Sequence, residues 1–154
     1  MRAVLAIAAA GLACVGVAVA ATPGIVIGHR IGAVKLDEPK AQVIKALGRG
    51  TSALVEGNRA RFYRKLGIYV LYPPKRSLPQ RVFVIETRSD RYKTSSGIGV
   101  GSSLRQLRRA VDVTCHASGR SIVCYHRAAP TSFLLRKSNK RITAISVAST
   151  APYK

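Results

Sequence analysis

The sequence predicts an α+β fold: two tandem repeats, each a short helix followed by a three-stranded antiparallel meander, packed as one domain. Three observations support this prediction. A pattern recurs at an offset of about 64 residues, long enough for a supersecondary unit. Each copy has helix start and stop signals. Each then continues as short runs rich in β-branched and aromatic residues. The copies span about 32–93 and about 97–154.

The first copy begins with a helix expected from Lys40 to Leu47. Val34 and Leu36 lead into the sequence Asp37-Glu38-Pro39, and Gly48 follows the last apolar position. Aspartate as the cap, proline in the first turn and glycine after the end are common helix boundaries. We therefore expect Asp37 to cap this helix.

The second copy begins with a helix that starts at Ser103. Ser103 and Gln106 have the spacing of a capping box, in which each residue binds a free backbone amide of the other. Leu104, Leu107 and Val111 recur at spacings of three and four and predict one buried face. The arginines between them then point toward solvent or a partner.

Three strand-like runs follow each helix, separated by turn residues. In the first copy they are roughly 59–64, 68–72 and 81–87, and in the second they are 121–126, 131–136 and 141–147. One copy of about 60 residues is small for an independent core. We therefore expect both helices and both sheets to form one body, and one such arrangement places the sheets side by side as a continuous surface.

The two cysteines that follow the N-terminal segment predict a disulfide across a hairpin. Gly119-Arg120 has the composition of a two-residue loop, in which glycine supplies a positive φ. Counting outward pairs Ser118 with Ser121, Ala117 with Ile122, His116 with Val123 and Cys115 with Cys124. The cysteines then occupy a non-hydrogen-bonded pair with Cα atoms about 4.5 Å apart. This spacing is within reach of a disulfide.

The N-terminal segment resembles a secretory signal peptide. Arg2 is followed by an uncharged run over 3–21, which includes the small-residue pattern Ala18-Val19-Ala20. We predict a signal peptide over 1–20 and a single exported domain over 21–154, without a stable membrane span after cleavage. The alternative is an uncleaved anchor, because the run approaches the roughly 20 residues that span a bilayer. The expected location is secreted, periplasmic or at the cell envelope.

The charge balance is strongly basic. The chain has 26 lysine and arginine residues against 6 acidic ones, for a formal net charge of +20 at pH 7. Such an excess attracts polyanions, including nucleic acid, anionic lipid, cell-wall phosphates and acidic proteins. A bias in base composition toward arginine is the alternative explanation.

Basic residues and tyrosines occur together along the predicted strands and on the second helix, where they form a candidate binding surface. The candidates are Arg59, Arg61, Tyr63, Tyr69, Lys75, Arg76, Arg105 and Arg109. Alternation along a strand places Arg59, Arg61 and Tyr63 on one face. The alternative is a solvated outer face, where most charged residues lie.

Two segments carry a likeness to a known family: the run from Val34 to Val43 with Leu47-Gly48, and the run from Gly97 to Leu104. In both, an apolar-x-apolar step leads into a short helix with spaced valine or leucine. Duplicated behind a signal peptide, this layout resembles the β-lactamase-inhibitor-protein fold and its single-copy SmpA/OmlA relatives. The resemblance implies a non-enzymatic protein-binding module of the cell exterior, and no binding residue is carried over from it.

Other chemistries are disfavoured by the residues. The glycines of 97–103 lack the lysine of a phosphate-binding loop. A zinc site of Cys115, His116, Cys124 and His126 conflicts with the hairpin register, which places His116 on the opposite face from both cysteines. We expect no metal and no cofactor.

Catalysis is also not expected, because the chain has few candidate groups. Hydrolysis needs a nucleophile with a base, or two carboxylates. An enzyme remains an alternative only if a cleft gathers His29, His126 and an acid. The leading hypothesis is a binding module that holds an acidic protein on its sheet surface. The alternative is a basic protein that binds an anionic envelope polymer.

Overall fold

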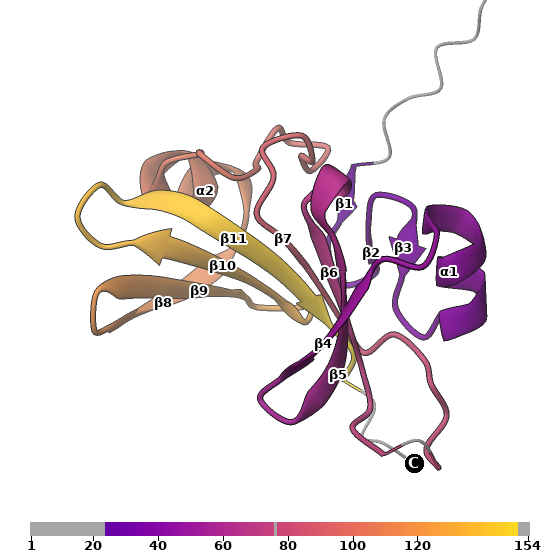
Figure 1. The fold of residues 1–154 in the computed structure, drawn as a ribbon. Helices are drawn as coiled ribbons and strands as arrows, with labels where there is room; N and C mark the ends of the chain where they lie inside the picture. Colours follow the sequence, from indigo (N-terminus) through magenta and orange to yellow (C-terminus); the bar gives the residue numbers. More distant parts are fainter. Residues whose placement is uncertain (1–23, 76, 151–154) are drawn as a thin grey trace, which may run out of the picture.

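The computed structural model describes residues 24–75 and 77–150, and this part of the chain is mostly β-structure (Figure 1). A small sheet contains β1 (Ile25–Val26), β2 (Arg30–Ile31) and β3 (Val34–Lys35). A large sheet contains β4 (Thr51–Val55), β5 (Asn58–Tyr63), β6 (Ile68–Tyr72), β7 (Val84–Thr87), β8 (Val113–Ser118), β9 (Ser121–His126), β10 (Thr131–Arg136) and β11 (Arg141–Ala148). The helices are α1 (Lys40–Leu47) and α2 (Leu104–Ala110), with a 3-10 turn at Arg64–Leu66.

The predicted fold class is wrong. The large sheet is a single antiparallel sheet of eight strands in the order β4-β5-β6-β7-β11-β10-β9-β8, not two three-stranded meanders. Backbone pairing of β7 with β11 crosses the proposed boundary between the copies, as in the pairs Ile145↔Thr87 and Ala148↔Val84. The reason is physical. The last strand of a short meander has backbone amides and carbonyls without partners on its outer side, and here the outer sides of β7 and β11 pair with each other.

The predicted strands differ from the observed ones mainly by omission. The runs 68–72, 121–126 and 131–136 are strands with the predicted bounds. The run 81–87 is shorter, because only Val84–Thr87 forms the strand. Strand β4 was missed because Thr51–Val55 has no aromatic residue and no alternation of polar and apolar positions. The strands of the small sheet have two residues each and are too short to predict.

Helix α1 has the predicted bounds but not the predicted cap. Pro39 is the N-cap residue and no side chain caps the helix. Asp37 instead has a φ of 60°, and its amide donates to the carbonyl of Val82. The capping box of α2 is confirmed, since the Gln106 amide donates to Ser103 Oγ at 3.2 Å and Gln106 Oε1 accepts from the Ser103 amide at 2.8 Å.

One face of the large sheet forms the core together with both helices. Strand β6 alternates buried and half-buried residues, and its buried Ile68, Val70 and Tyr72 share a core cluster with Val43 of α1. Leu107 of α2 belongs to the same cluster. Hence the two helices and the small sheet cover one face of the sheet.

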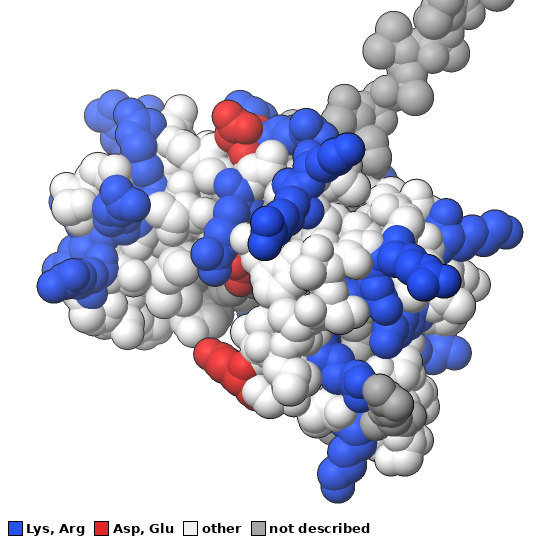
Figure 2. Space-filling view, viewed as in Figure 1, with Lys and Arg blue, Asp and Glu red and all other residues white. Residues whose placement is uncertain are grey.

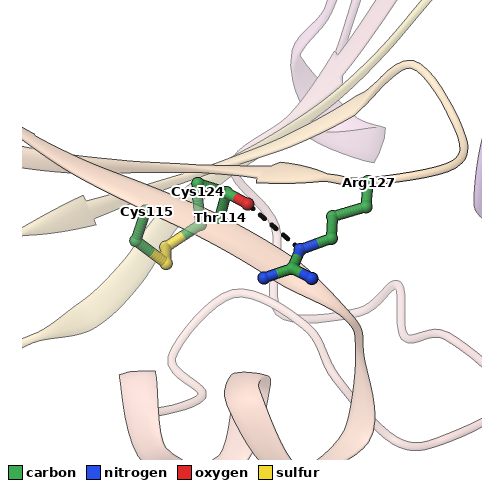
Figure 3. Close-up of a disulfide and its surroundings, with 4 residues drawn as sticks. All are labelled: Thr114, Cys115, Cys124 and Arg127. Carbon is green, nitrogen blue, oxygen red and sulfur yellow. Dashed lines mark hydrogen bonds between the residues drawn. A yellow bond between two sulfur atoms is a disulfide. The ribbon is translucent and has the colours of Figure 1, made fainter.

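The hairpin of β8 and β9 has the predicted register, and the predicted disulfide is confirmed (Figure 3). Cys115 and Cys124 are direct cross-strand partners with a Cα–Cα distance of 4.0 Å. Such a bond is typical of proteins that fold in an oxidising compartment.

The predicted signal peptide over 1–20 lies outside the described residues. Within the described part of the chain, neither helix has the length and apolar character needed to cross a bilayer.

Candidate functional site

The face of the large sheet opposite the helices carries a band of partly exposed apolar side chains, which we call the open face. The register places Phe62 beside Tyr69, Leu71 beside Val84 and Leu134 beside Val123 on this side. None of these side chains belongs to the core cluster. Tyr125, farther along β9, is 52% exposed. The open face therefore extends apolar and aromatic groups across the strands of both halves of the sheet.

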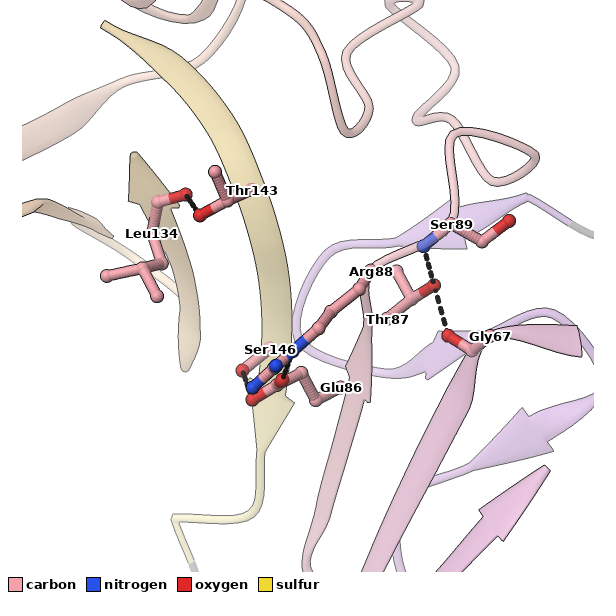
Figure 4. Close-up of polar contacts among 8 residues, drawn as sticks. All are labelled: Gly67, Glu86, Thr87, Arg88, Ser89, Leu134, Thr143 and Ser146. Carbon is pink, nitrogen blue, oxygen red and sulfur yellow. Dashed lines mark hydrogen bonds and ion pairs between the residues drawn. The ribbon is translucent and has the colours of Figure 1, made fainter. Parts of the chain in front are cut away.

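A small polar network lies near the junction of β7 and β11 on the open face (Figure 4). The Arg88 Nε donates to Glu86 Oε1 at 2.8 Å, and Ser146 Oγ lies 3.4 Å from Glu86 Oε2. The Arg88 guanidinium also lies 5.2 Å from the centroid of the Tyr69 ring. The hydrogen bond to Glu86 raises the pKa of Arg88. This network neutralises the one carboxylate that the open face carries at this junction.

A hollow of about 460 Å³ lies at the β4 end of the open face. Thr51, Ala53, Phe62, Tyr69 and Arg64 are among its lining residues. The Phe62 and Tyr69 rings meet edge to face, with centroids 4.6 Å apart and an interplanar angle of 82°. The hollow thus combines an aromatic floor with a basic rim.

The predicted trio on β5 faces the core and not the open face. Arg59, Arg61 and Tyr63 do share one side of the strand, because they alternate with Ala60 and Phe62. Tyr63 is only 5% exposed, so it does not offer a contact surface. Arg61 is half-buried, and its guanidinium donates to the carbonyl of Arg49.

The other predicted residues are dispersed. Tyr69 lies on the open face, whereas Lys75 is exposed in the loop after β6. Arg76 lies outside the described residues. Arg105 and Arg109 are exposed on α2 and line a hollow of about 550 Å³ with Arg108 and Lys140. The structure does not bring the predicted set into one surface.

Sequence reasoning also missed a second basic hollow, of about 600 Å³, between the β8–β9 and β10–β11 turns. Arg120, Arg136 and Lys137 are among its lining residues, and the Lys137 amide donates to the Arg120 carbonyl. The only sequence signal was that each turn carries lysine or arginine. Figure 2 shows basic side chains at several separate places over the visible face and acidic ones at only a few.

Tyr63 and Tyr72 share a buried polar cluster beneath α1. Both hydroxyls and Arg61 Nε are buried and have no hydrogen-bond partner among the described residues. Burial, together with the charges of Tyr63 and Glu38, raises the pKa of Tyr72 well above its usual value of 10.0, although the positive charge of Arg61 acts in the opposite direction. The cluster stabilises the neutral phenol.

Replacing Tyr72 with phenylalanine is expected to change stability little at pH 7, because the hydroxyl that it removes has no partner. The unfolded chain releases the Tyr72 proton near pH 10, whereas the folded chain releases it only at higher pH. The contribution of the Tyr72 phenol to the stability of the wild-type protein is therefore full below about pH 10 and is lost progressively above it. Urea unfolding at pH 7, 10 and 11 should show a shallower fall for Tyr72→Phe. If the free energy of unfolding falls equally with pH in the wild-type protein and the variant, this prediction is contradicted.

The loop over 97–103 uses its amides within the protein. The Gly101 amide donates to the carbonyl of Ile142, and the Ile98 amide donates to Thr94 Oγ1 at 3.0 Å. The Gly99 amide donates to Ser102 Oγ at 3.1 Å. These bonds fix the entry to α2 and leave few amides for an anion, as a structural entry loop requires.

His29 and His126 do not lie together with an acid in one hollow. His29 and Asp37 line a hollow of about 520 Å³ whose lining residues do not include His126. His126 Nδ1 accepts from the Ala128 amide at 3.1 Å. Among the described residues, no three His, Cys, Asp or Glu side chains are placed to hold a metal ion, and the disulfide occupies both thiols.

Comparisons with known proteins give no family for this chain, and the similar structures that they find share few residues with it. No protein-family model matches the chain, and no curated protein matches it either. An extracellular protein containing an SCP domain from Bacillus anthracis str. Ames aligns with a TM-score of 0.49 and 6% identity. That alignment covers 75% of this chain and 44% of the other, so this chain spans less than half of that protein's length. The uncharacterized protein yfeY from Escherichia coli aligns with a TM-score of 0.49 and 9% identity, over 83% of this chain and 97% of that one.

Proposed function

We propose that this protein is a secreted or periplasmic, non-enzymatic module that binds an acidic protein partner on its open face. The observation that supports this most is the apolar character of β6 on both sides. Tyr69 and Leu71 are half-buried on the open face while Ile68, Val70 and Tyr72 fill the core. Sheets with one solvated face usually carry polar residues there. An apolar band on the open face is therefore typical of an interaction surface.

The charge balance supports an acidic partner. The chain carries 26 basic and 6 acidic residues, so complementary charge would increase the rate of encounter. On the face that Figure 2 shows, basic side chains lie at several separate places, so an acidic partner would be attracted to more than one part of this face. The kinship with β-lactamase-inhibitor and SmpA/OmlA proteins stays a prediction.

The second candidate function is binding of an anionic envelope polymer. The two basic hollows favour it, because Arg105, Arg108, Arg109 and Lys140 line one and Arg120, Arg136 and Lys137 line the other. Binding that depends mainly on phosphate contacts falls steeply and linearly in log salt.

Capture from envelope extract by the domain over 21–154 separates the two functions. We expect a retained protein at both low and high salt, and a loss of about tenfold or more in capture when Tyr125 and Leu134 are both replaced with alanine. Truncating buried interface side chains typically has an effect of this size.

The matched control is Arg105→Ala with Arg109→Ala on α2, which should leave protein capture at high salt unchanged. If replacing the two arginines abolishes capture, or if only an anionic polymer is retained and high salt removes it, polyanion binding replaces the proposed function. If neither a protein nor a polymer is retained at low or at high salt, both candidate functions are contradicted.

A further inference from the structure

In the described part of the chain, strand β4 is an edge of the large sheet without the usual protection. It pairs only with β5, at the end of the strand order. Natural proteins blunt such edges with charged residues, proline, bulges or covering segments. The run Thr51–Val55 has neither a charge nor a proline, and its first four residues are exposed.

The other edge, β8, is also largely exposed, but a charged side chain lies beside its start. The Arg127 side chain lies against it, with Nε 3.2 Å from Thr114 Oγ1 and 3.3 Å from Asp112 Oδ1 (Figure 3). A charged side chain of this kind blocks approach of another strand. The two edges of the sheet therefore differ in the charged side chain beside them: β8 has Arg127 against Thr114, and no charged residue lies within β4.

The register identifies the backbone groups that β4 presents. Glu56 and Gly57 have φ values of 50° and 77°, as in a two-residue hairpin turn closed by the pair Val55↔Asn58. Pairs alternate from there between hydrogen-bonded and non-hydrogen-bonded. Ser52 and Leu54 fall in non-hydrogen-bonded pairs, so their amides and carbonyls point away from β5. Neither residue makes a backbone bond elsewhere in the described chain.

The side chains around β4 offer places for alternate residues of an added strand. Thr51 and Ala53 line the hollow whose floor is Phe62 and Tyr69. On the other side of the strand, Leu54 is 73% exposed. An incoming strand would place every second side chain at the hollow and the others beside Leu54.

The charges around β4 favour an acidic segment over a second copy of this chain. Arg64 is among the residues that line the hollow, and Arg59 of β5 pairs with Leu54 of β4. Neither arginine forms an ion pair with a described carboxylate. A second copy would carry the same excess of 26 basic over 6 acidic residues, and like charges at an interface are unfavourable.

We propose that β4 binds an extended segment of an acidic partner by strand addition, with apolar side chains at the hollow and acidic side chains toward Arg59. Backbone hydrogen bonds from Ser52 and Leu54 would supply affinity, and the hollow on one side of the strand would supply specificity. This inference rests on the proposed protein-binding function and names the form that the partner takes at this edge.

A labelled peptide of four Val-Glu repeats tests the proposal, because its valines and glutamates alternate with strand periodicity. We expect micromolar binding that Leu54→Pro weakens at least tenfold, since proline removes an outward amide and cannot extend a ladder. Leu54→Ala should weaken binding less. The matched control is Ala117→Pro, at the equivalent position of β8, which should leave the affinity unchanged. Circular dichroism would verify that each variant is folded.

Amide hydrogen exchange on the wild-type protein provides a test that needs no variant. Exchange at Ser52 and Leu54 should slow by tenfold or more in saturating peptide, while Cys115 and Ala117 of β8 remain unchanged. No binding in the micromolar range, protection at β8, or equal affinity of Leu54→Pro would overturn the proposal. Capture of a protein partner by the Leu54→Pro variant as strongly as by the wild-type protein would also overturn strand addition at β4. That result would still be compatible with binding on the open face.

Discussion

Replacing Phe133 with alanine is expected to lower the free energy of unfolding by about 3–5 kcal/mol, the range typical of a buried phenylalanine. Phe133 is fully buried in the core face of β10, where it pairs with Cys124 on one side and Ile145 on the other. Both neighbours are strand residues held by ladder bonds, so the site has little freedom to collapse around the cavity. Equilibrium urea denaturation would measure the loss.

The control for this cavity is Phe62→Ala on the open face. Phe62 is half-buried and meets the Tyr69 ring edge to face, so we expect a loss of about 1–2 kcal/mol. Equal losses at the two positions would contradict the assignment of one face to the core and the other to solvent.

Removal of the disulfide by Cys115→Ala with Cys124→Ala is expected to destabilise the protein by about 2.5 kcal/mol. The bond closes a loop with a sequence separation of 9, and loop-closure entropy gives a value of this size. For a domain of this size, the midpoint of thermal unfolding should fall by roughly 10 °C. Differential scanning calorimetry measures both quantities.

Reduced wild-type protein is the control for the disulfide, because it keeps both side chains and loses only the bond. Its melting temperature should approach that of the double variant. A reduced protein that melts like the oxidised one would show that the β8–β9 hairpin does not need the bond. Because Cys124 is the direct neighbour of Phe133, the effects of the two changes should not add.

Much of the local structure could be predicted because it depends on neighbouring residues. The two-residue turn at Gly119-Arg120 fixed the register that joins Cys115 to Cys124, since counting from a tight turn leaves no freedom. The Ser103–Gln106 capping box is confirmed for the same reason. The Asp37 cap failed because the chain there bonds to Val82, a contact 45 positions away.

The candidate surface was predicted less well, because residues on one strand reveal a shared face but not which face is covered. Arg59, Arg61 and Tyr63 do alternate as expected, but α1 packs on their side of the sheet. Tyr69 lies on the other side, and Arg105 belongs to α2. Only the position of the helices distinguishes a core face from an open face.

By itself, the sequence determined the bounds of α1, the α2 cap, most strands of the large sheet and the disulfide, because short-range geometry governs each of them. The tertiary structure decided that β7 pairs with β11 to make one sheet, and that no described helix or strand covers the outer side of β4 or the open face. These features depend on backbone groups that are distant in sequence, and such groups pair only with partners that the folded chain brings beside them. Local residue patterns do not contain that information.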